Sequence, residues 1–84
     1  MSWWVYIIKC SDDTFYTGIT TELQRRVYEH NNTNKGAKYT RHRRPVTLVH
    51  SEPYLDRSEA SKREYHIKKL SRDNKIRLIV TKTK

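Results

Sequence analysis

The run WWVYIIK at residues 3–9 constrains the fold more than any other stretch of the chain. Its aromatic and β-branched residues fill both alternating positions of a strand, so both faces of that strand need a cover. The turn-forming sequence SDDT at 11–14 follows and leads into a second strand-like run, FYTGI at 15–19. We therefore predict a β-hairpin whose first strand lies in the interior of a sheet that is covered on both sides.

The length of the hairpin loop decides whether Tyr6 and Tyr16 share a face of the sheet. A two-residue loop at Asp12-Asp13 would pair Tyr6 with Ile19 and place the two tyrosines on opposite faces. A three-residue loop would place them on the same face. Because a buried phenol needs a hydrogen-bond partner, two tyrosines on one face would indicate a polar site there.

The first helix is predicted directly after the hairpin. Thr21 as N-cap and Gln24 three residues later form a capping box, and the helical pattern runs to about Asn31. Arg26 and His30 share the apolar face of this helix, because residues three or four apart lie on one side. Arg26 would lie at the rim of the core, pair with a carboxylate of the fold, or bind a phosphate.

A second long helix also begins with a capping box. Asp56 is the expected N-cap and Glu59 the third helical residue, Leu55 is placed to pack on Ala60 as a hydrophobic staple, and the pattern continues to about Leu70. The remaining predicted elements are a strand at Val46–His50 and a short helix within the tail, Ser71–Lys84. This order, β-β-α-loop-β-α-α, predicts an α+β fold in which helices pack on a small sheet.

Glu64 is the carboxylate that folding alone explains least well. It lies on a helical stripe of small and apolar residues that begins at Ala60 and should face inward, whereas Glu52 and Glu59 have ordinary positions. An inward glutamate is expected to be ion-paired, to bind a metal or to be protonated. An ion pair with Arg26 therefore competes with a metal-binding role, and both interpretations bring the two residues close together.

Tyrosine, arginine, histidine and one inward glutamate are suited to phosphodiester hydrolysis. Glu64 would hold one divalent cation, Mg²⁺ or Mn²⁺, with water at the other positions. Arg26 would hold the phosphoryl oxygens, and a phenol or His30 would take the proton from an attacking water. A free phenol is a poor base, so a cation or basic neighbour must lower its pKa, and Lys9 or His30 would supply that effect.

The charge of the chain points to a polyanionic partner. Eighteen lysines and arginines against nine acidic residues give a formal net charge of +9 in 84 residues, which build a single domain over 1–84. No apolar run approaches the roughly 20 residues that span a bilayer, so we expect no membrane contact and a cytoplasmic location. The single cysteine, Cys10, has no partner for a disulfide or a zinc site and is expected to be a buried apolar residue.

A basic segment without helical or strand pattern lies between the first helix and the third strand. It contains Gly and Pro but no acidic residue, and it is expected to include at most one helical turn. We predict that it binds a nucleic-acid backbone and that Tyr39 stacks on an exposed base, whereas a solvated basic loop is the alternative. The residues predicted to contact nucleic acid are Lys35, Lys38, Tyr39, Arg41, Arg43 and Arg44.

Together these residues resemble the GIY-YIG nuclease superfamily. The matching elements are VYI at 5–7, YTG at 16–18, Arg26 and His30 four residues apart, and Glu64 on a later helix. The segments GAKYTRHRRP and EASKREYHIKKL extend the resemblance over nearly the full length, to the small single-domain bacterial branch called UPF0213. Val5 stands where the first motif begins with glycine, and Thr17 stands in the middle of the second.

The resemblance implies a three-stranded antiparallel sheet flanked by helices and metal-dependent cleavage of nucleic-acid backbones. By this resemblance Tyr6 and Tyr16 are the motif tyrosines, and Gly18 is the motif glycine. It also implies that Arg26 clamps phosphate, His30 is an auxiliary polar residue and Glu64 is the metal ligand. It does not decide which tyrosine acts as the general base.

Three functions remain open from the sequence. The leading one is a structure- or strand-selective nuclease that acts on DNA in repair or recombination. The second is a nucleic-acid-binding module with little turnover, for which RNA is the other possible ligand. The third is a subunit that needs a protein partner for target choice, since many members of the superfamily join this module to a separate DNA-binding domain. The inward Glu64 favours the nuclease, because a pure binder has no need for a carboxylate opposite a phosphate.

Overall fold

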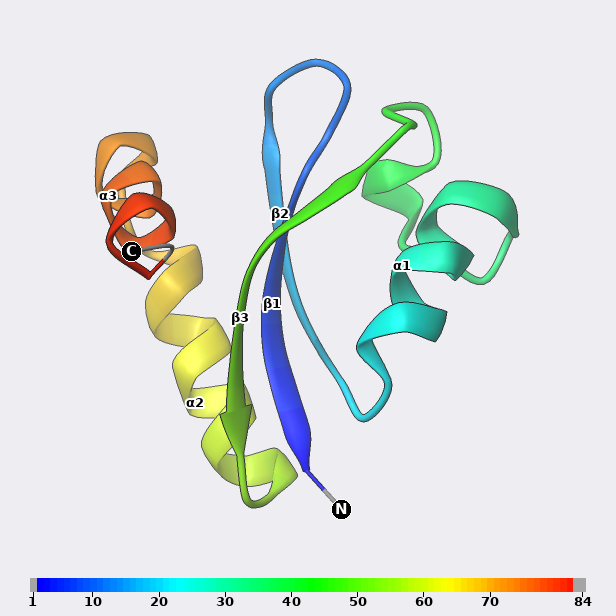
Figure 1. Cartoon of the computed structure of the whole chain (residues 1–84). Coiled ribbons are helices and arrows are strands. Elements are labelled where there is room, and N and C mark those ends of the chain that lie inside the picture. The colour runs from blue at the N-terminus through cyan, green and yellow to red at the C-terminus, as the bar shows by residue number, and fades with distance from the viewer. Residues whose placement is uncertain (1, 83–84) are drawn as a thin grey trace.

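Three strands form one antiparallel sheet in the computed structural model of the chain, which describes residues 2–82 (Figure 1). The strands are β1 (Trp3–Lys9), β2 (Phe15–Thr20) and β3 (Thr47–Tyr54), and their order in the sheet is β2-β1-β3. Both neighbours run antiparallel to β1. The predicted α+β class and the interior position of the first strand are therefore confirmed.

Helices cover both faces of the sheet. Helix α1 (Leu23–Asn32) and the 3₁₀ helix η1 (Lys38–Thr40) lie on one face, and helices α2 (Arg57–Lys68) and α3 (Arg72–Lys82) lie on the other (Figure 1). None of the helices within residues 2–82 is long and apolar enough to cross a bilayer. The predicted helical turn in the basic segment corresponds to η1, and the predicted tail helix corresponds to α3.

Strand β1 takes part in two separate apolar cores because its side chains alternate between the faces. Val5 and Ile7 are fully buried against α2, whose Ala60 and Ile67 complete that core. On the opposite face Tyr6, Ile8, Cys10 and Val46 form the second core, against which Leu23 and Val27 of α1 pack. The burial of Cys10 agrees with its predicted role as a small apolar residue.

The hairpin loop has three residues, 11–13. The Cys10 amide donates to the Thr14 carbonyl oxygen over 2.8 Å, and the Asp13 amide donates to the Cys10 carbonyl oxygen over 3.0 Å. Asp13 has a φ of 66°, the left-handed conformation that closes a three-residue hairpin and that aspartate tolerates. The resulting register pairs Tyr6 with Gly18, so Tyr6 and Tyr16 lie on the same face.

Helix α1 begins one residue later than predicted. Thr21 is not its N-cap, because Glu22 occupies that position and makes no side-chain capping bond. The hydroxyl oxygen of Thr20 accepts a hydrogen bond from the Glu22 amide over 3.1 Å instead. The threonine before the predicted cap therefore satisfies the free amide at this helix start.

Strand β3 is longer than the predicted Val46–His50. It continues through Glu52 and Pro53, two residues that usually disfavour strands. Proline is tolerated here because β3 is an edge strand of the sheet.

The predicted hydrophobic staple before α2 is wrong, since Leu55 is 91% exposed. The predicted cap of that helix is confirmed, because the Asp56 carboxylate accepts a hydrogen bond from the Glu59 amide over 2.9 Å.

The two capping predictions lead to a direct stability test. Replacing Asp56 with Ala removes a capping bond and should lower the free energy of unfolding by about 1 kcal/mol. Thr21→Ala is the matched control and should change it by less than about 0.5 kcal/mol, because Thr21 caps no helix. Urea denaturation followed by circular dichroism measures both values. Equal losses in the two variants would contradict the assignment of the caps.

Candidate active site

Four of the five predicted site residues meet on the face of the sheet that α1 covers. The ring of His30 lies between the rings of Tyr6 and Tyr16, with centroid distances of 5.9 Å and 5.4 Å and edge-to-face geometry at both contacts. Arg26 lies one helical turn before His30 on the same side of α1 and reaches the phenol of Tyr6. The helical spacing predicted the shared face of Arg26 and His30, and the three-residue loop, one of two lengths that the sequence left open, adds both tyrosines to it.

Gly18 makes room for the ring of Tyr6. A Cβ atom at this position would lie 2.6 Å from the Tyr6 hydroxyl oxygen and 2.8 Å from the ring carbon that carries it. Glycine is required here by space and not by backbone conformation, since none of the described glycines has a positive φ. Across the sheet, Gly18 is also the direct partner of Tyr6. The motif glycine thus determines where the phenol lies.

A chain of hydrogen bonds sets the protonation of His30. The Thr40 hydroxyl has one proton and donates it to the Ala37 carbonyl oxygen over 2.9 Å. Its oxygen must therefore accept the proton of His30 Nδ1, which lies 2.9 Å away. His30 Nε2 is then unprotonated and accepts the hydrogen bond of the Tyr6 hydroxyl over 2.9 Å. A long contact of 3.4 Å from the Ala37 amide to Nδ1 opposes this tautomer only weakly.

The pKa values of the two bonded groups are shifted in opposite directions. Burial raises the pKa of Tyr6 to about 12, although the guanidinium of Arg26 acts against this increase. Burial, and next the positive charge of Arg26, lower the pKa of His30 to about 4. At neutral pH the phenol is therefore protonated and the imidazole is an uncharged proton acceptor. The sequence had predicted a neighbour that lowers the pKa of the phenol, and the structure shows a net increase instead.

Arg26 connects the phenol to the basic segment. Its Nε donates to the Tyr6 hydroxyl oxygen over 3.4 Å, a long and weak bond. Its Nη1 donates to the Glu29 carboxylate over 3.0 Å and to the Lys35 carbonyl oxygen over 2.8 Å. The guanidinium remains partly exposed. Arg26 therefore pairs with a carboxylate of its own helix, and the bond to Tyr6 is the one most easily exchanged for another acceptor.

Glu64 lies on α2, on the opposite side of the sheet from α1, and its charge contributes to the raised pKa of Tyr6. Its side chain is 23% exposed, and its carboxylate pairs with the Lys68 ammonium group at 3.2 Å. The competing ion pair with Arg26 is not formed. Lys9, which was predicted as an alternative to His30 for lowering the pKa of the phenol, pairs with Asp13 at the hairpin loop instead.

Within residues 2–82, the carboxylate with the most hydrogen-bond donors was not predicted from the sequence. Glu52 is buried, contrary to its predicted ordinary position, and Arg63 of α2 grips both of its oxygens at 2.9 and 3.1 Å. His50 Nε2 and the Tyr54 hydroxyl also bond to it, at 2.7 and 2.8 Å. Burial would raise the pKa of Glu52, but these donors outweigh it and lower the pKa to about 2. The alternation of His50, Glu52 and Tyr54 along one strand was the available signal.

Two arginines of the basic segment support the fold. Arg44 donates from Nε to the His30 carbonyl oxygen over 2.6 Å and from Nη2 to the Thr33 carbonyl oxygen. It thereby closes the C-terminal end of α1, where carbonyl groups lack helical partners. Arg41 donates to the Asn34 carbonyl oxygen over 3.3 Å at an exposed position. The predicted contact of both residues with nucleic acid stays a prediction.

Tyr39 and Arg43 link the basic segment to the hairpin. The ring of Tyr39 stacks on Tyr16 at a centroid distance of 6.0 Å, and the guanidinium of Arg43 lies 4.1 Å from the centroid of the Tyr39 ring. Arg43 also pairs with Asp12 at 3.1 Å. The ammonium groups of the segment that have no hydrogen-bond or ion-pair partner within residues 2–82 are those of Lys35 and Lys38.

Comparison with known proteins places this arrangement in a family. Residues 2–77 match the family described as the GIY-YIG catalytic domain. A UPF0213 protein of Desulfotalea psychrophila is 60% identical over 78 residues, which cover 93% of this chain and 71% of that protein. A UPF0213 protein of Halobacterium salinarum is 62% identical over 71 residues, which cover 84% of this chain and 91% of that protein.

Solved structures agree with the fold. The solution NMR structure of a UPF0213 protein from Bacillus halodurans is 44% identical and matches with a TM-score of 0.63, over 98% of this chain and 86% of that one. The solution NMR structure of a protein from E. faecalis is 47% identical and matches with a TM-score of 0.66, over 96% of this chain and 85% of that one. The fold and the site thus define a protein with a GIY-YIG catalytic domain, a class that supports a nuclease-type function. Within that class, the chain belongs to the UPF0213 family.

The close contact at Gly18 predicts a coupled defect. Gly18→Ala should push the Tyr6 ring away from His30 and lower the free energy of unfolding by about 1–3 kcal/mol. In a Tyr6→Phe background the same substitution should cost less, because the atom of closest contact is gone. Denaturant unfolding of the four proteins gives the coupling energy. Equal costs in both backgrounds would show that the ring does not depend on the glycine.

The lowered pKa of His30 predicts a loss of stability in acid. The unfolded chain binds a proton at this residue near its ordinary pKa of 6.5, and the folded chain binds it only near 4. The stabilisation is therefore complete above pH 6.5 and is lost as the pH falls toward 4, on the order of 3 kcal/mol in total. Unfolding measurements from pH 7 to pH 4.5 should show this slope, and His30→Gln should lack it.

An NMR titration of the imidazole resonances keeps this test decisive if His30→Gln does not fold. A midpoint near pH 4 agrees with the buried neutral tautomer. A midpoint near 6.5 would mean that the ring is not held in the hydrogen-bond chain between Tyr6 and Thr40.

Proposed function

We propose that this protein is a metal-dependent nuclease that hydrolyses phosphodiester bonds of DNA, and that it selects its substrate by strand structure in repair or recombination. The observation that carries the proposal is the hydrogen-bond chain from Arg26 through Tyr6 to His30. It places an anion-binding guanidinium and an uncharged proton acceptor on either side of one phenol oxygen. The net charge of +9 supplies the long-range attraction for a polyanion.

Arg26 is the group that would hold the scissile phosphate. Its guanidinium is partly exposed, and the bond that it makes to Tyr6 is long. A phosphate oxygen is a stronger acceptor than a neutral phenol, so a bound substrate would replace this contact. Tyr6 is only 1% exposed in the free protein. Rotation of Arg26 onto the phosphate would therefore also open the phenol oxygen to an attacking water.

Proton transfer would then pass through the phenol. A water that attacks the phosphorus gives its proton to the Tyr6 oxygen while the phenol gives its own proton to His30 Nε2. Nδ1 of His30 keeps its bond to Thr40, so the ring holds its orientation as it becomes charged. The charge of Arg26 lowers the pKa of His30 in the free protein. Neutralisation of that charge by a phosphate makes His30 a better acceptor when substrate is bound.

Glu64 is the residue that would hold a divalent cation. Within residues 2–82 there is no cluster of three or more His, Cys, Asp or Glu placed around one ion. A single partly exposed carboxylate fits Mg²⁺ or Mn²⁺ bound with water and substrate phosphate at the remaining positions. When bound, such an ion stabilises the charge that develops on the leaving oxygen.

Cleavage of labelled single-stranded, duplex and branched DNA with Mg²⁺ or Mn²⁺ tests the proposal, with binding recorded in parallel without metal. Glu64→Gln and Tyr6→Phe should each lower the cleavage rate by about 100-fold or more and leave binding within about twofold. Glu59→Gln is the matched control, since it removes an exposed carboxylate from the same helix. Tyr16→Phe in the same series shows whether the second phenol is also required.

The outcomes separate the three candidate functions. Binding without cleavage under every condition would contradict the nuclease and favour a nucleic-acid-binding module, for which RNA is then the next ligand to test. Cleavage that survives Tyr6→Phe would contradict the proton path through this phenol. Activity that appears only in a complex isolated from cell extract would identify a subunit that depends on a protein partner.

A further inference from the structure

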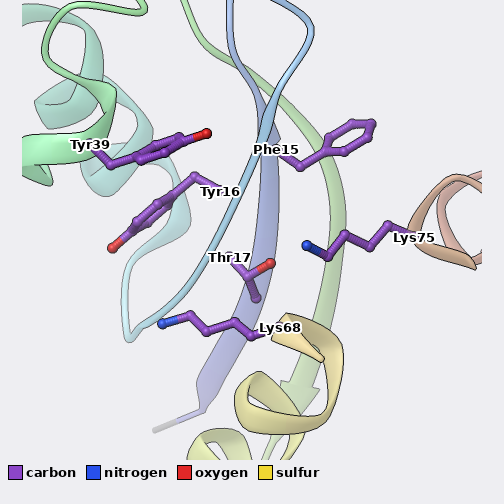
Figure 2. Close-up of a pocket in the computed structure, with 6 residues that line it drawn as sticks. All are labelled: Phe15, Tyr16, Thr17, Tyr39, Lys68 and Lys75. Atoms are coloured by element: carbon purple, nitrogen blue, oxygen red, sulfur yellow. The ribbon is translucent and has the colours of Figure 1, made fainter. Parts of the chain in front are cut away.

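A groove crosses the free edge of strand β2, next to the candidate active site. It has a volume of about 210 Å³. Tyr16 and Tyr39 form one wall, and Phe15 lies on the opposite side of the strand (Figure 2). Thr17 lies between them, and the lysines Lys68 and Lys75 complete the lining. None of the roles assigned above uses Thr17, Lys75 or this space.

Two lysines from different helices line the groove. Lys75 of α3 directs its ammonium group toward Thr17, and the side chain of Lys68 from α2 runs past Thr17 toward the side of Tyr16 (Figure 2). Lys68 is paired with Glu64, but the Lys75 side chain makes no hydrogen bond or ion pair within the described part of the chain. Two lysines line the groove and one carboxylate pairs with Lys68, so a positive charge is left uncompensated, which favours an anion.

Thr17 offers a hydrogen-bond donor in the same place. The residue is 4% exposed, yet its hydroxyl makes no hydrogen bond to any residue of 2–82. Its oxygen is not among the enclosed polar atoms that lack a partner, so it opens onto the groove. A hydroxyl with an available proton, set among ammonium groups, matches the acceptor oxygens of a phosphate.

The groove and the candidate active site share strand β2. Thr17 stands between Tyr16 and Gly18, and successive strand residues point to opposite faces about 3.3 Å apart. Tyr16 therefore contacts His30 and also borders the groove, while Thr17 lines the groove from the other face of the strand. Lys68 makes a second connection, because its ion-pair partner is Glu64. A strand that lies across the edge of β2 would meet both places in turn.

We propose that this groove binds a backbone phosphate of the substrate strand next to the scissile one, through Lys68, Lys75 and the hydroxyl of Thr17. This inference rests on the proposed function, since it defines a second position on the same nucleic-acid strand. Phe15 and Tyr39 border the adjoining sugar and base. A phosphate at this position also draws the Lys68 ammonium group from Glu64, which leaves that carboxylate free for a cation.

The experiment pairs single-residue variants with single-phosphate changes. The probes are fluorescent single-stranded DNA oligonucleotides in which one phosphate at a time is replaced by an uncharged methylphosphonate. Affinities are measured by fluorescence anisotropy in EDTA, so that no cleavage occurs. The variants are Lys75→Gln, Lys68→Gln and Thr17→Val. Lys62→Gln is the matched control, because it removes an exposed lysine of α2 that lies outside the groove.

In the wild type, one methylphosphonate position should weaken binding by about tenfold, the effect of losing a charge-assisted hydrogen bond. The Lys75→Gln variant should bind this modified oligonucleotide and the unmodified one equally well, because the ammonium group that contacts the phosphate is gone. Lys68→Gln and Thr17→Val should reduce the effect in part, and Lys62→Gln should leave it intact. Lys75→Gln should also reduce the slope of log affinity against log salt by about 0.7.

The outcomes distinguish this inference from the proposed function. If the wild type cuts DNA but no methylphosphonate position loses its effect in Lys75→Gln, the second phosphate site is wrong and the nuclease assignment stands. If the coupling is found although no cleavage is seen with Mg²⁺ or Mn²⁺, the groove binds phosphate and the nuclease assignment fails. If the wild type does not bind the oligonucleotides at all, both proposals fail.

Discussion

The buried hydrogen bond between the Tyr6 hydroxyl and His30 Nε2 is the contact on which the geometry of the site depends. Both side chains lie within the core, so loss of either partner leaves a polar group without water to replace it, at a cost of about 1–3 kcal/mol. The bond forms only if residues from other segments are in place. Gly18 must leave space for the phenol, and Thr40 must hold the other nitrogen of the imidazole. A single interaction thus ties the hairpin, α1 and the turn at η1 together.

Glu52 and Glu64, two inward carboxylates on the α2 side of the molecule, differ in how many of their acceptor sites are already used by hydrogen bonds. Both oxygens of Glu52 are occupied by donors from Arg63, His50 and Tyr54, so that carboxylate has no capacity left for a ligand. Glu64 has one partly exposed lysine as its partner and keeps acceptor capacity. Burial and a shifted pKa alone would have selected Glu52. The number of unused acceptor sites instead favours Glu64 as the candidate ligand for a cation.

Much of the fold could be predicted because its signals are local. The two apolar faces of the first strand required covering layers on both sides, and the cap at Asp56 depends on residues within one helical turn. The face shared by Arg26 and His30 follows from helical spacing alone. The hairpin loop was harder, since its sequence fits two lengths, and the left-handed φ of Asp13 decides between them.

The rest depended on contacts between distant segments, which a single sequence does not encode locally. Thr40 lies in a segment without periodicity, and only the packed structure brings its hydroxyl to His30. Glu52 lay outside the predicted strand Val46–His50, and the arginine that pairs with it lies 11 residues further on, in α2. The start of α1 was missed for a different reason, since Glu22 takes the N-cap position without a side-chain capping bond and its amide donates to the hydroxyl of Thr20.

The pleat of strand β2 directs neighbouring residues to two different faces of the sheet. Tyr16 and Gly18 point toward α1, where the phenol and imidazole groups meet, and Thr17 between them points toward α2 and α3. Because β2 is an edge strand, neither set is buried beneath another strand. Helices α2 and α3 contribute Lys68 and Lys75 on one face of the sheet at this edge, and α1 contributes Arg26 on the other face. A polyanionic strand lying along the edge would meet positive charge on both faces of the sheet at Tyr16, Thr17 and Gly18.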